Sequence, residues 1–200
     1  MGTELEWKYA VPEPSLLDEI LAWEEIEKRM TEAPRQYHMR SDYFDTADRR
    51  FSQGQITLRC RLENETSVVC VKAPLPDADD PQLRGEWELA GDEPAAVLPR
   101  LVALGAPRAL LESGALQILC RADFTRRAVP LRFADGSAAE LALDCGTLFG
   151  PSCAAPLCEL ELEWKAGEPA AARAFAEAIA ARFRLEAQPL SKFARAKALK

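Results

Sequence analysis

The pentapeptide Glu-Leu-Glu-Trp-Lys occurs twice in this chain of 200 residues, at Glu4-Leu5-Glu6-Trp7-Lys8 and at Glu161-Leu162-Glu163-Trp164-Lys165. Charged and apolar residues alternate in both copies. Successive side chains of a β-strand point to opposite faces, so this alternation is typical of a strand whose two faces differ. Each copy therefore predicts a strand, over residues 3–11 and 157–165, with one charged and one apolar face.

The same alternation predicts six further strands, at residues 37–45, 55–63, 67–73, 84–90, 117–129 and 138–145. Helices are expected from Pro14 to about Met30, at 94–104 and at 169–184, where apolar residues follow a helical period. Many strands with few helices and no regular βαβ alternation predict an α+β fold. We expect one domain, residues 1–200, built as an eight-stranded antiparallel β-barrel with helices packed on the outside.

Composition and charge narrow the classes of function. The apolar content of 48% predicts a globular chain, and a net charge of −7 disfavours nucleic acid and anionic membranes as partners. No apolar stretch is long enough to cross a bilayer and the N-terminus lacks a secretion signal, so we expect a cytoplasmic location. The six cysteines form no CxxC pair and are predicted to be reduced, with a metal or redox role as the alternative.

The charged strand faces contain almost only carboxylates, guanidiniums and amines. One interpretation is a solvated face on a half-exposed antiparallel sheet. The other is that helices cover the apolar outside of a closed sheet, so that the charged faces line a channel. Unpaired buried charges cost several kcal/mol each. Such a channel must therefore contain water and a charged ligand that pairs with these side chains. Arg and Lys suit phosphate oxygens and carboxylates suit Mg²⁺ or Mn²⁺, which predicts a metal–polyphosphate ligand.

The order of several motifs resembles the CYTH superfamily, the triphosphate tunnel metalloenzymes. Glu4-Leu5-Glu6-Trp7-Lys8 matches the family's ExExK strand. Other segments resemble its later motifs: Tyr43-Phe44-Asp45-Thr46, Leu58-Arg59-Cys60-Arg61, Val71-Lys72, Arg84-Gly85-Glu86-Trp87-Glu88, Asp123-Phe124-Thr125-Arg126, Ala142-Leu143-Asp144, Cys158-Glu159-Leu160-Glu161-Leu162-Glu163 and Leu190-Ser191-Lys192. The resemblance covers the whole chain and is closest to bacterial short-chain tripolyphosphatases.

The resemblance implies a tunnel that binds a small-molecule triphosphate with Mg²⁺ or Mn²⁺. It implies phosphate contacts from Lys8, Arg40, Arg59, Arg61, Lys72, Arg126 and Lys192. It implies metal ligands among Glu4, Glu6, Asp144, Glu159 and Glu161, of which Glu159 and Glu161, together with Lys8, are the expected catalytic residues. Glu86, Glu88 and Glu163 are expected to contact these residues without touching the ligand themselves.

The predicted reaction is hydrolysis of tripolyphosphate to pyrophosphate and phosphate, by in-line attack of water. A carboxylate of Glu159 or Glu161 is expected to take the proton of the water, and the choice between them stays open. Alternatives are a thiamine or nucleoside triphosphatase or a class IV-type adenylate cyclase. Thiamine triphosphatases carry an aromatic residue where this chain has Thr57. A non-catalytic polyphosphate or nucleotide sensor is an alternative of another class.

Four features outside the charged faces have simpler interpretations. His38, the single histidine, is expected to be structural or solvated. Ser191 is predicted to lie at a strand end rather than to act as a nucleophile. The alanine-rich segment 170–181 predicts a helix packed on the barrel. Lys165 is expected at the tunnel mouth.

Overall fold

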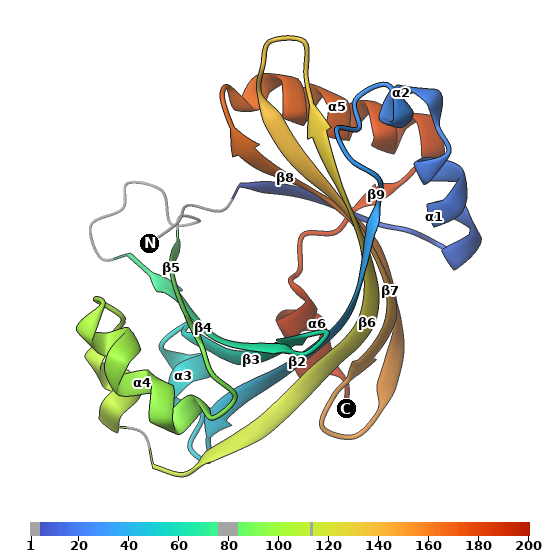
Figure 1. Ribbon diagram of the computed structural model, residues 1–200. Coiled ribbons are helices and arrows are strands. Elements are labelled where there is room, and N and C mark those ends of the chain that lie inside the picture. Colours follow the sequence, from blue (N-terminus) through green and yellow to red (C-terminus); the bar gives the residue numbers. More distant parts are fainter. Residues whose placement is uncertain (1–4, 76–83, 113) are drawn as a thin grey trace.

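The computed structural model describes residues 5–75, 84–112 and 114–200. Its strands form one curled antiparallel sheet in the order β5-β4-β3-β2-β6-β7-β8-β1-β9 (Figure 1). The strands are β1 (Glu6–Ala10), β2 (Arg35–Thr46), β3 (Thr57–Glu63), β4 (Thr66–Pro74), β5 (Arg84–Ala90), β6 (Leu116–Arg132), β7 (Ala138–Phe149), β8 (Ala154–Ala166) and β9 (Glu186–Ala187). The predicted α+β architecture is confirmed.

The barrel differs from the prediction in strand number and closure. The sheet has nine strands rather than eight, because the chain after the long C-terminal helix adds β9 at the edge of β1, where Tyr9 pairs with Ala187. A two-residue strand is too short to leave a periodic pattern in the sequence. Among the described residues, no hydrogen-bonded pairing joins the two edge strands β5 and β9.

Proline begins three helices: α1 (Pro14–Leu21), α4 (Pro94–Ala103) and α5 (Pro169–Phe183). Proline suits the first helical turn, where its missing N–H has no partner to lose. The expectation of one helix up to Met30 is wrong, because the chain is extended at Trp23 and resumes as α2 (Glu24–Glu27). The Trp23 ring stacks on Phe175 of α5, with ring centroids 5.8 Å apart, and this contact explains the break. No helix in the described part of the chain is long and apolar enough to span a bilayer.

Two apolar clusters lie between the helices and the outer face of the sheet. Helices α1, α2 and α5 cover the first, which holds Leu141, Leu160 and Leu162 with the half-buried Trp7 and Trp164. The second holds Leu58, Val69, Val71 and Trp87 under α3 (Arg50–Gln53), α4 and the 3₁₀ helix η1 (Arg108–Glu112). The predicted apolar faces therefore lie under the helices.

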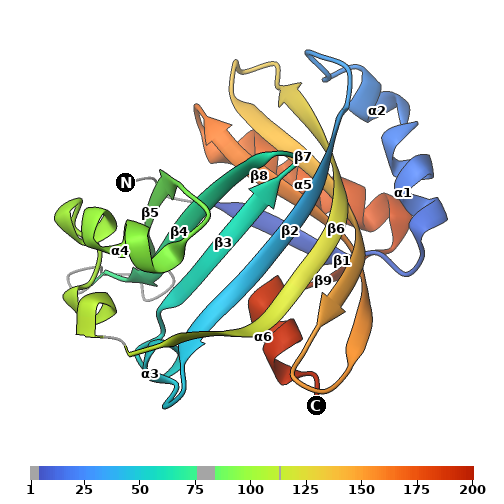
Figure 2. The ribbon, with the colours of Figure 1, turned by 60° about the horizontal axis from the view of Figure 1, so that its bottom comes forward.

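One helix lies on the inner face, contrary to the expectation that all helices pack outside. Helix α6 (Lys192–Ala198) packs against β6 and β7 (Figure 2), with Ala196 in a cluster that includes Met39 and Phe124. The predicted strand end at Ser191 is also wrong. Ser191 caps α6, because its Oγ accepts a hydrogen bond of 3.1 Å from the Ala194 N–H. The helix brings its first residue, Lys192, into the centre of the curled sheet.

The two Glu-Leu-Glu-Trp-Lys copies lie side by side. Strands β1 and β8 are antiparallel neighbours in which Glu6 is opposite Glu163 and Lys8 is opposite Glu161. The Trp164 N–H donates to the Leu5 carbonyl oxygen at 2.9 Å. The predicted strands are present, and the structure adds that the two copies pair with each other.

Candidate functional site

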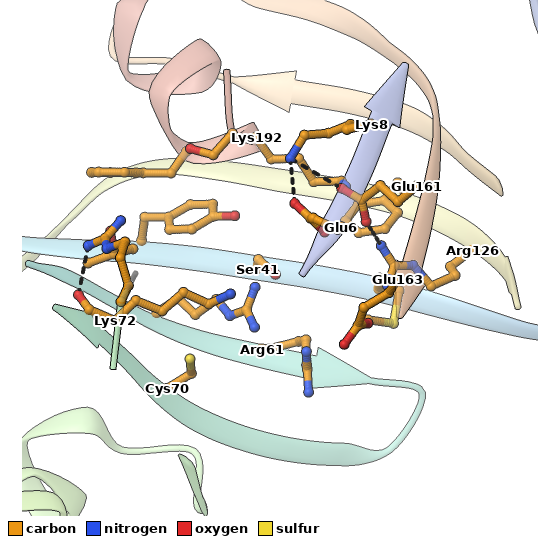
Figure 3. Close-up of a pocket in the computed structure, with 18 residues that line it drawn as sticks. Glu6, Lys8, Ser41, Arg61, Cys70, Lys72, Arg126, Glu161, Glu163 and Lys192 are labelled. Carbon is orange, nitrogen blue, oxygen red and sulfur yellow. Dashed lines mark hydrogen bonds and ion pairs between the residues drawn. The ribbon is translucent and has the colours of Figure 1, made fainter. Parts of the chain in front are cut away.

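A cavity of about 160 Å³ lies inside the curled sheet (Figure 3). Among the described residues, seven cationic and three carboxylate side chains line it: Lys8, Arg59, Arg61, Lys72, Arg84, Arg126 and Lys192, with Glu6, Glu161 and Glu163. This cationic lining belongs to a protein whose net charge is −7. An excess of positive charge in an enclosed space selects anions.

A buried carboxylate cluster lies at one wall of the cavity, which it reaches through Glu161. Asp144 and Glu159 are opposite each other on β7 and β8, and both side chains are fully buried. Glu161 is two residues further along β8 and so points to the same face. The Lys192 ammonium contacts all three, at 2.7 Å from Asp144 Oδ2, at 2.8 Å from Glu161 Oε1, and also at Glu159 Oε1.

Two arginines complete the charge pairing of this cluster. Arg126, opposite Asp144 on β6, donates to Asp144 Oδ1 and Oδ2 at 2.8 and 2.7 Å and to Glu161 Oε2 at 2.6 Å. Arg195, one helical turn after Lys192, binds Glu159. Buried ions are tolerated when they are paired and hydrogen-bonded in this way. The cluster therefore fixes Arg126 and Lys192 in place at the cavity wall (Figure 3).

The two glutamates of the cluster have opposite pKa shifts. Burial raises the pKa of Glu159, and this effect outweighs the attraction of Lys192. Burial also acts to raise the pKa of Glu161, but Lys192, Arg126 and Lys8 outweigh it and hold the pKa well below its usual range. Burial acts to lower the pKa of Lys192, and the carboxylates Asp144, Glu161 and Glu159 more than reverse it. Glu161 is thus an ionised carboxylate at neutral pH.

The opposite wall is basic and more loosely paired. Arg59 and Arg61 project from β3, at 3.6 and 3.7 Å from Glu88 Oε1, and Lys72 Nζ on β4 lies 3.4 Å from Glu86 Oε1. The Nε atoms of Arg59 and Arg61 are buried and have no hydrogen-bond partner among the described residues. Buried donors are normally satisfied, so these two indicate a missing acceptor.

The carboxylates fit a hard divalent cation. Asp144, Glu159 and Glu161 offer oxygen atoms within 4.8 Å of one another, and Mg²⁺ and Mn²⁺ prefer oxygen ligands. The Lys192 ammonium now occupies the centre of this set, whereas Glu6 and Glu161 face the cavity. A second group, Cys70, Glu86 and Glu88, includes a thiol and is a softer donor set.

Comparison with known proteins identifies the family. Residues 2–196 match the family model of the CYTH domain. The chain belongs to the CYTH family. CYTH proteins act on small-molecule triphosphates and depend on a divalent metal.

Solved structures share the fold of this CYTH protein at low sequence identity. A candidate adenylyl cyclase from Hippeastrum, described as having a dominant triphosphatase activity, is 20% identical with a TM-score of 0.57, covering 98% of this chain and 97% of the other. A candidate adenylate cyclase from Bacillus halodurans is 17% identical with a TM-score of 0.55, covering 96% of both chains. The PH1819 protein of Pyrococcus horikoshii OT3 is 17% identical with a TM-score of 0.57, covering 96% of this chain and 97% of the other.

The structure brings most of the predicted site residues of this CYTH protein together. Those that line the cavity are Glu6, Lys8, Arg59, Arg61, Lys72, Arg126, Glu161, Glu163 and Lys192. Those that contact these lining residues from behind are Glu86, Glu88, Asp144 and Glu159. The prediction for Glu4 lies outside the described residues.

Arg40 is the exception. Met39 and Ser41 line the cavity, so Arg40 between them points to the other face of β2. Its Nη2 donates to Asp42 Oδ2 at 3.0 Å, and Asp42 also binds Arg121. The structure therefore does not place Arg40 at the cavity. His38, Arg40 and Asp42 of β2 share the face that points away from the cavity, where His38 and Asp42 pair with Asp123 and Arg121 of the neighbouring strand β6.

Sequence reasoning missed several residues at the site, of which three are instructive. Arg84 lines the cavity and shares its strand face with Glu86 and Glu88, so the alternation on β5 could have identified it. Tyr43 also lines the cavity, and no charge marks its face of β2. Arg195 belongs to a helix that was not expected.

The remaining interpretations concern exposed residues. His38 Nε2 lies 2.8 Å from Asp123 Oδ1 on the protein surface, consistent with a structural or solvated histidine. Lys165 Nζ lies 2.7 Å from Glu163 Oε2, and Glu163 lines the cavity.

Proposed function

We propose that this CYTH protein hydrolyses inorganic tripolyphosphate to pyrophosphate and phosphate with Mg²⁺ or Mn²⁺. The observation that carries the proposal is the pair of buried Nε donors of Arg59 and Arg61, which face a cavity whose other wall holds Glu161 and Lys8. A short chain of phosphates satisfies such donors on one side and accepts charge-assisted hydrogen bonds on the other. The small volume of the cavity favours a compact polyanion.

The two basic walls have different roles in this proposal. Arg126 is already fixed by Asp144 and Glu161, so it binds phosphate oxygens without further ordering. Arg59 and Arg61 have ion pairs of 3.6 to 3.8 Å, which phosphate oxygens can replace with shorter contacts, and Lys72 lies beside them. Charge that grows on the leaving phosphate is neutralised by these groups.

Glu6 and Glu161, the carboxylates that line the cavity beside Lys8, would hold the divalent cation. When bound, this ion supplies positive charge that polarises the phosphoryl group and neutralises the oxygens. Lys8 Nζ lies 2.8 Å from Glu6 Oε1 and 3.7 Å from Glu161 Oε1, and so forms ion pairs with both carboxylates.

Of the two candidate bases, the geometry supports Glu161. It lines the cavity, whereas Glu159 is fully buried behind Lys192 and is bound by Arg195. Lys192, Arg126 and Lys8 outweigh burial and hold the pKa of Glu161 low, so its carboxylate is a weak base. We therefore assign Glu161 the role of accepting a hydrogen bond from the attacking water and aligning it, and Glu159 that of positioning Lys192.

Aromatic side chains at the cavity favour a second candidate, an organic triphosphate such as a nucleoside or thiamine triphosphate. Phe193 and Tyr43 both line the cavity, with ring centroids 5.0 Å apart. An exposed ring face offers a stacking surface for a base. A class IV-type adenylate cyclase or a non-catalytic sensor would bind its ligand in the same cavity.

The experiment is phosphate release from tripolyphosphate, ATP and thiamine triphosphate side by side, each with Mg²⁺ and with Mn²⁺. We expect the highest kcat/KM for tripolyphosphate. A higher value for either organic substrate supports the second candidate, and pyrophosphate as the product from ATP supports a cyclase. Tight binding of tripolyphosphate without release of phosphate under any of these conditions supports the sensor.

The expected cytoplasmic location and the exclusion of nucleic acid and membranes as partners stay predictions. The exclusion of nucleic acid and membranes rests on the net charge of −7, and the location rests on the sequence pattern described above.

A further inference from the structure

Two cysteines face each other on the outer side of the sheet, away from the cavity. In the pairing of β7 with β8, Cys145 is opposite Cys158. Both side chains are half-buried and pack against the apolar cluster under α1 and α5. The neighbouring residues Asp144 and Glu159 point into the site, so the two thiols lie on the reverse side of the strands that carry the carboxylate cluster.

The backbone hydrogen bonds show which kind of pair the cysteines form. The Cys158 carbonyl oxygen accepts from the Val11 N–H at 3.0 Å, and the Trp164 N–H donates to Leu5. Even-numbered residues of β8 thus direct their backbone groups to the β1 side. Because the N–H and C=O of one strand residue point to the same side, Cys158 shares no ladder hydrogen bond with Cys145.

This geometry suits a covalent link. Directly opposite residues of a non-hydrogen-bonded antiparallel pair have Cα atoms about 4.5 Å apart, and their side chains approach most closely. Disulfides span Cα separations of about 4.4 to 6.8 Å.

We propose that Cys145 and Cys158 form a dithiol site that low-molecular-weight disulfides oxidise to a cross-strand disulfide. In the first step the thiolate of one cysteine attacks oxidised glutathione, forms a mixed disulfide and releases one glutathione thiol. In the second step the other cysteine attacks the protein sulfur of the mixed disulfide, forms the Cys145–Cys158 bond and releases the second glutathione. Two electrons and two protons pass from the protein to the two glutathione molecules.

The bond would join β7 to β8 beside Asp144 and Glu159. It closes the hairpin between these strands and so restricts the unfolded chain, which stabilises the folded protein. The dithiol site thus couples the redox state of the surroundings to the rigidity of the two strands behind the carboxylate cluster.

The test uses the full chain and oxidised glutathione at about pH 8.5, where more of a thiol is ionised. We expect peptide mapping to link Cys145 to Cys158, with the linked peptides two hydrogens lighter than the two separate peptides, and the urea midpoint to rise until a reductant is added. The single variants Cys145→Ser and Cys158→Ser should each retain one glutathione at the remaining cysteine. Cys60→Ser, which removes a half-buried thiol elsewhere in the sheet, should still form the link.

Three outcomes would overturn the proposal. One is wild-type protein that carries glutathione at both cysteines without a link. Another is a link that involves the exposed Cys153 in place of either partner. The third is native protein that does not react while urea-unfolded protein does, since this shows that the fold holds the sulfur atoms out of reach.

Discussion

Arg126 binds Asp144 through two parallel hydrogen bonds, of 2.8 and 2.7 Å, and Asp144 is fully buried. The carboxylate therefore holds a guanidinium at the cavity wall, and Arg126 Nη2, which donates to Asp144 Oδ2, also donates to Glu161 Oε2 at 2.6 Å. A buried carboxylate thus positions a residue that faces the ligand.

The substitution Asp144→Asn should lower the free energy of unfolding by about 3 kcal/mol, because it leaves Arg126 and Lys192 without one of their counter-charges in a buried place. Urea unfolding followed by circular dichroism measures the loss. Asp135→Asn, in an exposed turn, is the control and should change stability by less than about 1 kcal/mol. Equal effects of the two substitutions would contradict the assigned role of Asp144.

The substitution Glu161→Gln should lower kcat for tripolyphosphate by about 100-fold or more, since it removes the carboxylate that aligns water and faces the cation. Glu159→Gln should reduce kcat less, because its partners are Lys192 and Arg195 rather than the ligand. It should also reduce stability less than Glu161→Gln, because Lys192, Arg126 and Lys8 outweigh burial and hold the pKa of Glu161 well below its usual range, whereas burial raises the pKa of Glu159. Phosphate release and urea unfolding on both variants separate these effects. A larger loss of kcat in Glu159→Gln would reverse the assignment.

The substitution Arg61→Met should weaken tripolyphosphate binding by about 10-fold or more, the contribution of one hydrogen bond to a charged group. Titration calorimetry without added metal measures it. Arg40→Met is the matched control, because it removes the same charge from the opposite face of the sheet and should leave affinity within about twofold. If both variants bind equally weakly, net charge rather than the cavity determines affinity.

The substitution Ser191→Ala should cost about 1 kcal/mol of stability, because the Ala194 N–H loses its acceptor at the start of α6. It should also raise KM, since Lys192 begins that helix. Ser191→Thr retains a capping oxygen and should recover most of both properties. Exposed Ser152 provides the control variant Ser152→Ala, which should match the wild type in urea unfolding.

Cys120 should react slowly with iodoacetamide, because burial raises the pKa of its thiol to about 12. A raised pKa means less thiolate at any pH below it, so the rate should rise about tenfold for each pH unit through the neutral and mildly alkaline range. Exposed Cys153 should be alkylated first, as peptide mass spectrometry over time can follow. In urea, where burial is lost, the two rates should converge.

The alternation in the sequence determined the strands and, on most of them, the face that points inward. It succeeded because two-residue periodicity and the separation of charged from apolar groups coincide on β1, β3, β5 and β8. On β2 they do not coincide, because Ser41 and Met39 face the cavity while Arg40 faces outward. Family resemblance alone placed Arg40 at the site, and strand geometry removes it.

Local patterns could not reveal α6 or β9. Helix α6 has seven residues, too few for an apolar period to stand out, and its stability comes from the Ser191 cap and from contacts on the inner face of the sheet. Pairing between the two Glu-Leu-Glu-Trp-Lys copies is equally invisible to local patterns, because register depends on the path of the whole chain.

That pairing has a consequence for assembly. Lys8 is opposite Glu161 and Trp7 is opposite Leu162, so an ion pair and an apolar pair match the two copies across the strands. The same pairing can form between two molecules, because β1 that detaches from one molecule can pair with β8 of another. Crowded refolding should therefore yield dimers that have exchanged their first strands, whereas dilute refolding should yield monomers.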